Sequence, residues 1–129
     1  MSNIILFGAN GNIGSYIYDQ FKDIYKIKAV SKRKSNRNIF STNLDLLDNY
    51  QLSSFAKHHQ AFNCLIFLVG LAHKKGKSKR FNDFKEVNYQ TLVNLLSELD
   101  KNNILPEKII FSSTISVYGE KQHQSSYPE

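Results

Sequence analysis

The sequence predicts an α/β fold built on a doubly wound parallel sheet, and two observations support this prediction. Short apolar runs typical of buried strands alternate along the 129 residues with stretches in which apolar residues recur at helical spacing. A glycine triplet directly follows the first apolar run, where a strand would turn into a helix. Because strands that alternate with helices form parallel sheets with right-handed crossovers, one such domain is expected over residues 1–129.

The first half of the chain is expected to form strands and helices in alternation. Apolar runs predict strands at Ile4–Phe7, Ile27–Val30 and Ile39–Thr42. Residues at helical spacing predict a helix after the glycines and a second, shorter helix: Ile13, Tyr16, Ile17 and Phe21 in the former, and Leu52, Phe55 and Ala56 in the latter.

The second half continues the same alternation. The run Phe62–Val69 is almost continuously apolar, as expected for a strand that is covered on both faces. A longer helix is predicted by an apolar stripe: Phe84, Val87, Leu92, Leu95, Leu96 and Leu99. Pro106 ends that connection, Lys108–Ser113 is the fifth predicted strand, and the polar residues after Gly119 are expected to be loop. A sheet that stops at the fifth strand would expose an edge prone to aggregation.

Composition favours a cytoplasmic protein that does not enter a membrane. The hydrophobic fraction is 41%, and no apolar run approaches the ~20 residues of a membrane span. The first residues lack the basic flank and cleavage site of a signal peptide. The single cysteine, Cys64, lies inside an apolar run, so we expect a buried structural thiol.

The net charge of +6 does not indicate a nucleic-acid partner. Basic residues gather in two short stretches, Lys32–Arg37 and Lys74–Arg80, each of which follows a predicted strand. Neither stretch interleaves aromatic residues with Lys and Arg, and no predicted helix carries a basic stripe. Solvated loops are the plainer alternative at both places, and at Lys74–Arg80 they are what we expect.

The glycine triplet has the features of a diphosphate cradle. Gly8 can leave the strand with dihedrals that a side chain would forbid, Gly11 lets the backbone approach a pyrophosphate, and Gly14 lets the helix pack closely on the sheet. The start of the helix offers N–H groups and a partial positive charge. The plainer alternative is a glycine-rich turn. The residues expected to contact a dinucleotide here are Gly8, Asn10, Gly11, Asn12, Ile13 and Gly14.

Together with segments farther along, this motif resembles the extended short-chain dehydrogenase/reductases, which are NAD(P)-dependent sugar-nucleotide epimerases, dehydratases and reductases. The further segments are Leu44-Asp45-Leu46-Leu47-Asp48, Phe67-Leu68-Val69-Gly70-Leu71-Ala72-His73, Asn88, and Ile109-Ile110-Phe111-Ser112-Ser113-Thr114-Ile115-Ser116-Val117-Tyr118-Gly119. The resemblance implies a Rossmann-type sheet of five strands in the order 3-2-1-4-5, with the C-terminal part of the family domain missing.

The resemblance also implies roles for individual residues. Asp45 and Leu46 would contact the adenine, and Leu68, Val69 and Gly70 would line the cofactor ribose. Ser112 and Ser113 would also adjoin the cofactor. Thr114 would be the catalytic hydroxyl that orients the substrate oxygen, although neighbouring Ser113 is a competing assignment because adjacent strand residues point to opposite faces.

Several of these residues have plainer alternatives. Asp45 and Asp48 could be turn and helix-cap acids, and Asn88 could be an ordinary exposed helix residue. The adjacent His58 and His59 show no metal-ligand spacing with other candidate ligands, so we expect them at the surface.

The cofactor preference can be argued from the end of the second strand. A fold of this type that prefers NAD places an acid there to bind the ribose 2′-hydroxyl, whereas this chain has Ser31, Lys32 and Arg33. Ser31 could donate a hydrogen bond to a 2′-phosphate, and Arg33 could hold it bidentately. We therefore predict NADP(H) over NAD(H), against the alternative of solvated loop charge.

The catalytic machinery of the family is expected to be incomplete in this chain. The resemblance calls for a tyrosine acid/base and a lysine that lowers its pKa, in a Tyr-x-x-x-Lys segment downstream of Thr114. No such segment follows Thr114. We expect the cofactor-binding part of an enzyme whose intact parent acts on a sugar nucleotide, with dimerisation doubtful. The alternative is a non-catalytic dinucleotide-binding or sensing module.

Overall fold

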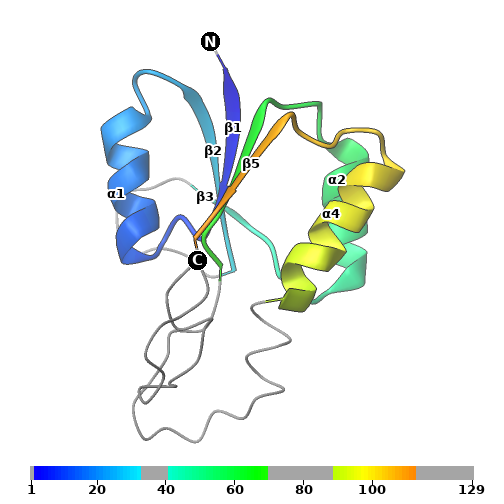
Figure 1. Ribbon diagram of the computed structural model, residues 1–129. Coiled ribbons are helices and arrows are strands. Elements are labelled where there is room, and N and C mark those ends of the chain that lie inside the picture. Colours follow the sequence, from blue (N-terminus) through cyan, green and yellow to red (C-terminus); the bar gives the residue numbers. More distant parts are fainter. Residues whose placement is uncertain (1, 33–40, 70–88, 113–129) are drawn as a thin grey trace, which may run out of the picture.

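The computed structural model describes residues 2–32, 41–69 and 89–112, and these form a five-stranded parallel sheet with helices on both faces (Figure 1). The strands are β1 (Asn3–Phe7), β2 (Lys26–Ser31), β3 (Ser41–Asn43), β4 (Cys64–Phe67) and β5 (Lys108–Phe111). The helices are α1 (Asn12–Phe21), α2 (Asn49–His58) and α4 (Thr91–Lys101).

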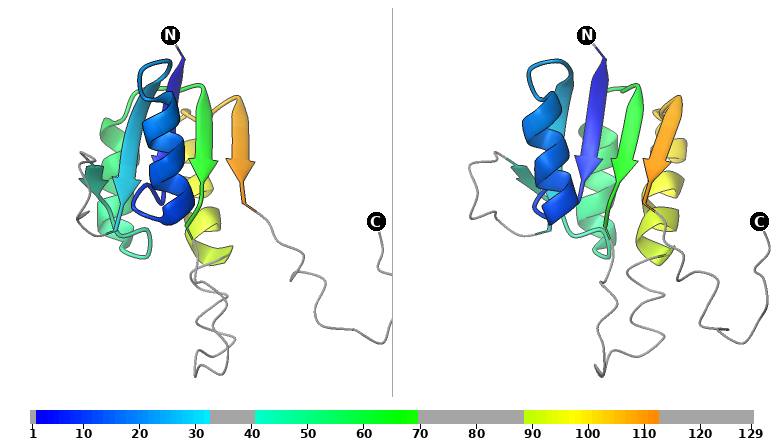
Figure 2. Two further views of the ribbon diagram at one scale, coloured as in Figure 1. Left: turned by 90° about the vertical axis from the view of Figure 1, so that its left-hand side faces the viewer. Right: turned by 60° about the vertical axis from the view of Figure 1, so that its left-hand side comes forward.

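The strands lie in the order β3-β2-β1-β4-β5, and all neighbouring pairs are parallel. This confirms the α/β class and the predicted order 3-2-1-4-5. Figure 2 shows that all strands run the same way, so that their carboxyl ends meet at one edge of the sheet. The chain passes from β1 into α1 at that edge.

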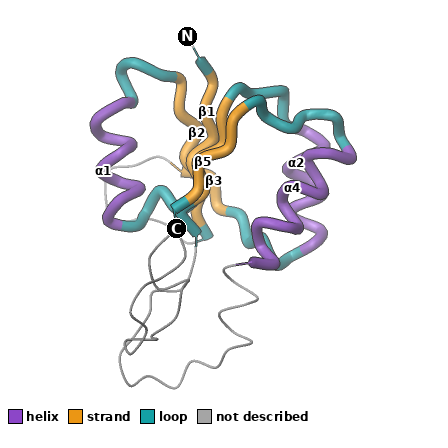
Figure 3. The backbone as a smooth tube through the Cα atoms, in the orientation of Figure 1, coloured by secondary structure: helices purple, strands orange, loops and turns teal. Residues whose placement is uncertain are grey.

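The helices divide the described residues into three layers. Figure 3 shows α1 on one side of the sheet and α2 with α4 on the other. Strand β1 serves both layers because its side chains alternate: Ile5 and Phe7 belong to the larger core beneath α2 and α4, and Leu6 to the smaller one beneath α1. A strand buried on both faces explains the continuous apolar run that the sequence shows there.

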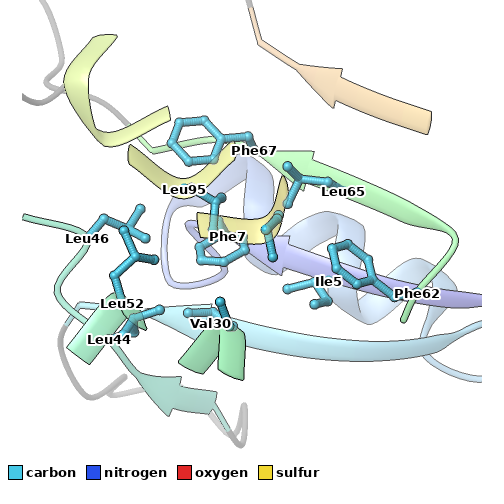
Figure 4. Packing of buried hydrophobic residues seen from close by; sticks show 12 residues of the cluster. Ile5, Phe7, Val30, Leu44, Leu46, Leu52, Phe62, Leu65, Phe67 and Leu95 are labelled. Atoms are coloured by element: carbon cyan, nitrogen blue, oxygen red, sulfur yellow. The ribbon is translucent and has the colours of Figure 1, made fainter. Parts of the chain in front are cut away.

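The larger core joins residues that are far apart in the sequence (Figure 4). Its most buried side chains, each with less than 2% of its surface exposed, include Phe7, Leu52, Leu65, Leu95 and Leu99. The smaller core consists of Leu6, Ala9 and Ala29, with partly buried residues of α1 and β4 packed against it.

The predicted elements are all present in the described residues, but one strand is clearly shorter than expected. The apolar run Phe62–Val69 contains only the four-residue strand β4, Cys64–Phe67. Phe62 precedes β4 and is buried in the larger core. Leu68 follows β4, at the level where β1 has ended and the chain turns at Gly8. Burial, rather than strand pairing, accounts for the extra apolar residues.

Smaller differences occur at three other predicted boundaries. Of the third predicted strand, residues 39–40 lie outside the described residues, and β3 runs from Ser41 to Asn43, one residue past the predicted end. The predicted stripe positions Phe84 and Val87 also lie outside, and α4 begins at Thr91. The fifth strand ends at Phe111, ahead of Ser112.

Strand β5 lies at the end of the described sheet and is exposed along its whole length. Ile109, Ile110 and Phe111 keep 40%, 48% and 58% of their surface exposed. On the α1 side, β4 and β5 border a pocket of about 610 Å³ whose lining includes Ile17 and Ile66. The described sheet thus ends in an exposed apolar strand, and aggregation at this edge stays a prediction.

Two further expectations concern membranes and the cysteine. None of the described helices has the length and apolar character needed to cross a membrane. Cys64 opens β4 and is half-buried rather than fully buried. Burial raises the pKa of its thiol, and nearby Lys108 acts in the opposite direction, so the described environment favours the unreactive protonated form.

Candidate functional site

The glycine loop at the carboxyl end of β1 owes its shape to two of its three glycines. Gly8 has a φ of 87°, and a Cβ there would lie 2.9 Å from the carbonyl carbon of Leu68. A Cβ at Gly14 would collide with the carbonyl oxygen of Gly8. Gly11 is different, since the nearest atom to a Cβ there is 3.5 Å away. The fold therefore requires Gly8 and Gly14, whereas Gly11 only keeps space open.

Helix α1 begins directly after this open glycine. Its N-cap is Gly11, which has no side chain to cap the helix, and no acidic residue lies in the first turn of this described helix. The Gly11 amide donates to the Gly8 carbonyl over 3.2 Å, which closes the turn. Backbone N–H groups and the positive end of the helix dipole therefore face the loop, an arrangement that suits an anion.

The loop is fastened to the end of β2 by both backbone and side chains. The amides of Gly8 and Ala9 donate to the carbonyl of Val30 over 3.0 and 3.4 Å. Asn10 Nδ2 donates to Ser31 Oγ over 2.9 Å. Ser31 keeps only 7% of its surface exposed. Asn10 and Ser31, both predicted to contact the cofactor, are thus hydrogen-bonded to each other where the glycine loop meets the end of β2.

A small pocket of about 80 Å³ lies at the same edge of the sheet. Its lining includes five of the residues predicted from the sequence to contact the cofactor: Ser31, Lys32, Asp45, Leu46 and Val69. Residues from three separate segments of the chain therefore converge beside the glycine loop, as expected at the carboxyl edge of an open parallel sheet. Leu68 lies against Gly8 itself.

The two acids of the Asp45–Asp48 segment have structural partners. Asp48 is the N-cap of α2, and its carboxylate accepts from the amides of Tyr50 and Gln51 over 3.0 and 3.2 Å. The helix-cap alternative is confirmed for Asp48. Asp45 accepts from the Leu47 amide over 3.0 Å, which makes a local turn, and it also lines the pocket.

Sequence reasoning missed several residues of this site. Thr91 and Leu47 line the pocket, and Thr91 is buried at the start of α4. Ser41 Oγ lies 3.2 Å from Ser31 Oγ. Thr91 and Ser41 are short polar residues next to apolar runs, and only the packing of separate elements brings Thr91 to the pocket and Ser41 to Ser31.

The adjacent histidines have different environments. His58 is exposed, as expected. His59 is half-buried, because it lies four residues after Phe55 and so on the same side of the end of α2. The His59 ring lies 5.0 Å from the Phe55 ring and 5.6 Å from the Phe62 ring, centroid to centroid. Burial lowers its pKa, the hydrogen bond to the Gln60 carbonyl opposes this, and Lys28 adds to the lowering. The described residues contain no group of three or more potential metal ligands around either histidine.

Other predicted site residues lie outside the described residues: Arg33, Gly70, Asn88, Ser113 and Thr114. Ser112 is described, and its amide donates to the Phe67 carbonyl over 3.4 Å at the end of β5. The spacing Tyr-x-x-x-Lys does occur at Tyr18 and Lys22, but these residues lie at the end of α1 remote from the glycine loop. Tyr18 packs against the smaller core there.

The comparison with known proteins agrees with this geometry. Residues 4–129 match the model of the NAD dependent epimerase/dehydratase family. The chain belongs to this family. Its sheet order and glycine loop are those of a Rossmann-type domain, as the resemblance implied.

Individual relatives of this family are distant in sequence and longer than the chain. Over 122 residues the chain is 26% identical to N-acetyl-alpha-D-glucosaminyl-diphospho-ditrans,octacis-undecaprenol 4-epimerase of Escherichia coli O157:H7, covering 94% of this chain and 35% of the relative. The solved UDP-Glc/GlcNAc 4-epimerase of Campylobacter jejuni superposes with a TM-score of 0.77 at 22% identity, covering 95% and 40%. MoeE5, solved with UDP-glucuronic acid and NAD, superposes with a TM-score of 0.73 at 20% identity, covering 91% and 38%. The chain thus spans little more than a third of the length of these proteins.

Proposed function

We propose that this chain binds a dinucleotide coenzyme, as the NAD(P)-binding part of a sugar-nucleotide epimerase, dehydratase or reductase. The observation that carries the proposal is the contrast among the glycines. Gly8 and Gly14 are required by packing, but Gly11 stands at the uncapped start of α1, and a methyl group added there would have no neighbour closer than 3.5 Å. The space at Gly11 has no packing reason and suits a diphosphate that contacts backbone amides.

In this proposal the coenzyme lies along the carboxyl edge of the sheet. The diphosphate is held at Gly11 and at the amides of the first turn of α1, including Ile13 and Gly14. The adenine half extends toward the pocket lined by Asp45 and Leu46, which lies beside the glycine loop. Family membership supports this assignment, because the family is described as NAD dependent.

We also propose that the coenzyme is NADP(H) rather than NAD(H). Ser31 ends β2, the exposed Lys32 follows it, both line the pocket, and no acid stands at either position. A carboxylate there would bind a ribose 2′-hydroxyl and repel a 2′-phosphate, whereas a lysine attracts the phosphate. Arg33 follows Lys32 and would add a second cation.

When bound, the coenzyme would supply hydride transfer to or from a sugar carbon. The sugar nucleotide is proposed as the substrate of the intact enzyme, in line with the epimerases that the chain resembles. Thr114 is proposed to orient the reacting oxygen, while its acid/base partner would be the family's tyrosine.

The test is a calorimetric titration of the 129-residue chain with NADPH and, separately, with NADH. We expect binding of both, with NADPH the tighter ligand. The matched variant is Gly11→Ala, because a methyl there contacts no described atom closer than 3.5 Å yet fills the space proposed for the diphosphate. This variant should unfold at the same temperature as the unaltered chain. It should bind both dinucleotides at least about tenfold more weakly, since the methyl group keeps the diphosphate away from the backbone. A folded chain that binds neither dinucleotide would overturn the proposal.

A further inference from the structure

Three polar side chains form a hydrogen-bonded chain from the glycine loop to the edge of the sheet. Asn10 in the loop donates to Ser31 Oγ at the end of β2 over 2.9 Å. Ser31 Oγ lies 3.2 Å from Ser41 Oγ, the first residue of β3. The middle member, Ser31, is 7% exposed. The Ser41 side chain on β3 is therefore connected to the glycine loop by two hydrogen bonds.

The register of the sheet explains how Ser41 reaches this position. Ser41 pairs with Ala29, which belongs to the smaller core on the α1 side of the sheet. Side chains of paired residues share a face, and Ser31 is two residues beyond Ala29 on the same face. Ser41 therefore points to the side on which Ser31 and Asn10 lie, and it reaches Ser31 diagonally.

We infer that Ser41 is a positioning residue for the coenzyme, acting through Ser31 on the glycine loop. This inference rests on the proposed dinucleotide site. The Ser41 hydroxyl fixes the rotamer in which Ser31 accepts from Asn10, and the Asn10 side chain fixes the turn between Gly8 and Gly11. Because hydrogen bonds in a partly buried chain orient and polarise one another, a bond at the outer end affects the geometry at the inner end.

The role is distinct from holding β3 in place. The strand is attached to β2 by parallel backbone pairing from Ser41 to Asn43, and the Leu44 amide donates to the Ser31 carbonyl over 2.8 Å. None of these bonds needs the Ser41 hydroxyl. Replacing Ser41 with alanine should thus leave the strand paired while breaking the chain to Asn10.

The experiment measures NADPH and NADH affinity and unfolding temperature for the 129-residue chain and its variants. Ser41→Ala is expected to weaken binding about two- to tenfold, the loss typical of one hydrogen bond, with the unfolding temperature little changed. Ser41→Thr keeps a hydroxyl and should restore affinity. Thr42→Ala is the matched control, since it also removes a hydroxyl from β3 but from the opposite face, and it should bind like the unaltered chain.

A double-mutant cycle tests whether Ser41 acts through Ser31. If it does, Ser31→Ala combined with Ser41→Ala should bind no more weakly than Ser31→Ala alone. Full additivity of the two effects, or unchanged affinity in Ser41→Ala, would overturn the inference while the unaltered chain still binds coenzyme. A folded unaltered chain without affinity for either dinucleotide would instead overturn the proposed function, and this inference with it.

Discussion

The carbonyl group of Gly8 fills the space in which a side chain at Gly14 would stand. A Cβ at Gly14 would be 3.0 Å from the carbonyl carbon of Gly8 and from the Cα of Ala9, and closer still to the Gly8 oxygen. All of these atoms are backbone, so they cannot move aside as a flexible side chain would. The start of α1 and the end of β1 are thus in direct contact, and this contact sets the shape of the glycine loop.

The first prediction compares two glycines of the same loop. Gly14→Ala should lower the free energy of unfolding by about 1–3 kcal/mol, the usual cost of an overpacked site, despite alanine's better helix propensity. Gly11→Ala should change it by much less, because no described atom lies within 3.5 Å of the new methyl. Urea denaturation followed by circular dichroism measures both. Equal destabilisation by the two substitutions would contradict the contact described above.

A second prediction concerns the start of α2. The Asp48 carboxylate accepts from the amides of Tyr50 and Gln51 and from the Gln51 side chain. Asp48→Ala removes this cap and should cost about 1 kcal/mol of unfolding free energy. Asp48→Asn retains an oxygen that can accept from the same amides, so it should lose only a fraction of that amount. Denaturation midpoints of the three chains provide the test, and a harmless Asp48→Ala would show that the cap contributes nothing.

The sheet could be predicted from the sequence because its strands are short, apolar and separated by helical spacing. Ile5, Leu6 and Phe7 are each no more than 1% exposed, and such burial on both faces is what a continuous apolar run signals. The same signal overestimates β4, since Phe62 and Val69 contribute to the core without taking part in its strand. Apolar character reports burial, whereas strand ends depend on where the neighbouring strand turns away.

The candidate site is predictable only in part, for a related reason. The glycine triplet could be recognised by its spacing. The fold class indicates that the residues at the end of β2 lie near the cofactor. Ser41 joins the site because β3 pairs with β2 next to Ser31, and Thr91 because the start of α4 borders the pocket. No local spacing encodes either relation. The sequence predicts a surface position for His59, but the Phe62 ring packs against the His59 ring. The sequence pattern does not encode this contact.

A third prediction tests the proposed coenzyme preference. Lys32 is exposed and borders the pocket at the end of β2. Lys32→Ala should weaken NADPH binding about three- to tenfold at low salt and leave NADH almost unchanged, because only NADPH carries the 2′-phosphate. Lys26→Ala removes the same charge from the opposite end of β2 and is the control. Calorimetry of both variants with both ligands would reject the preference if NADH and NADPH weakened equally.

The last prediction follows from the position of His59 between Phe55 and Phe62. Because burial and Lys28 lower the pKa of His59 in the folded chain, the unfolded chain takes up the proton first as the pH falls. The stabilising effect of the neutral ring is complete above the ordinary histidine pKa of about 6.5 and is lost as the pH falls through the folded pKa. The free energy of unfolding should therefore decrease as the pH is lowered below about 7, beyond what the carboxylates account for.

Two variants isolate this contribution. His59→Phe keeps an aromatic ring against Phe55 but cannot take up a proton, so its free energy of unfolding should depend less on pH between about 7 and 5. His58→Gln, at the exposed neighbouring position, should retain the pH dependence of the unaltered chain. Urea denaturation at half-unit pH steps gives both curves. If the His59→Phe curve parallels that of the unaltered chain, His59 does not cause the acid sensitivity, and other groups must be titrating in that range.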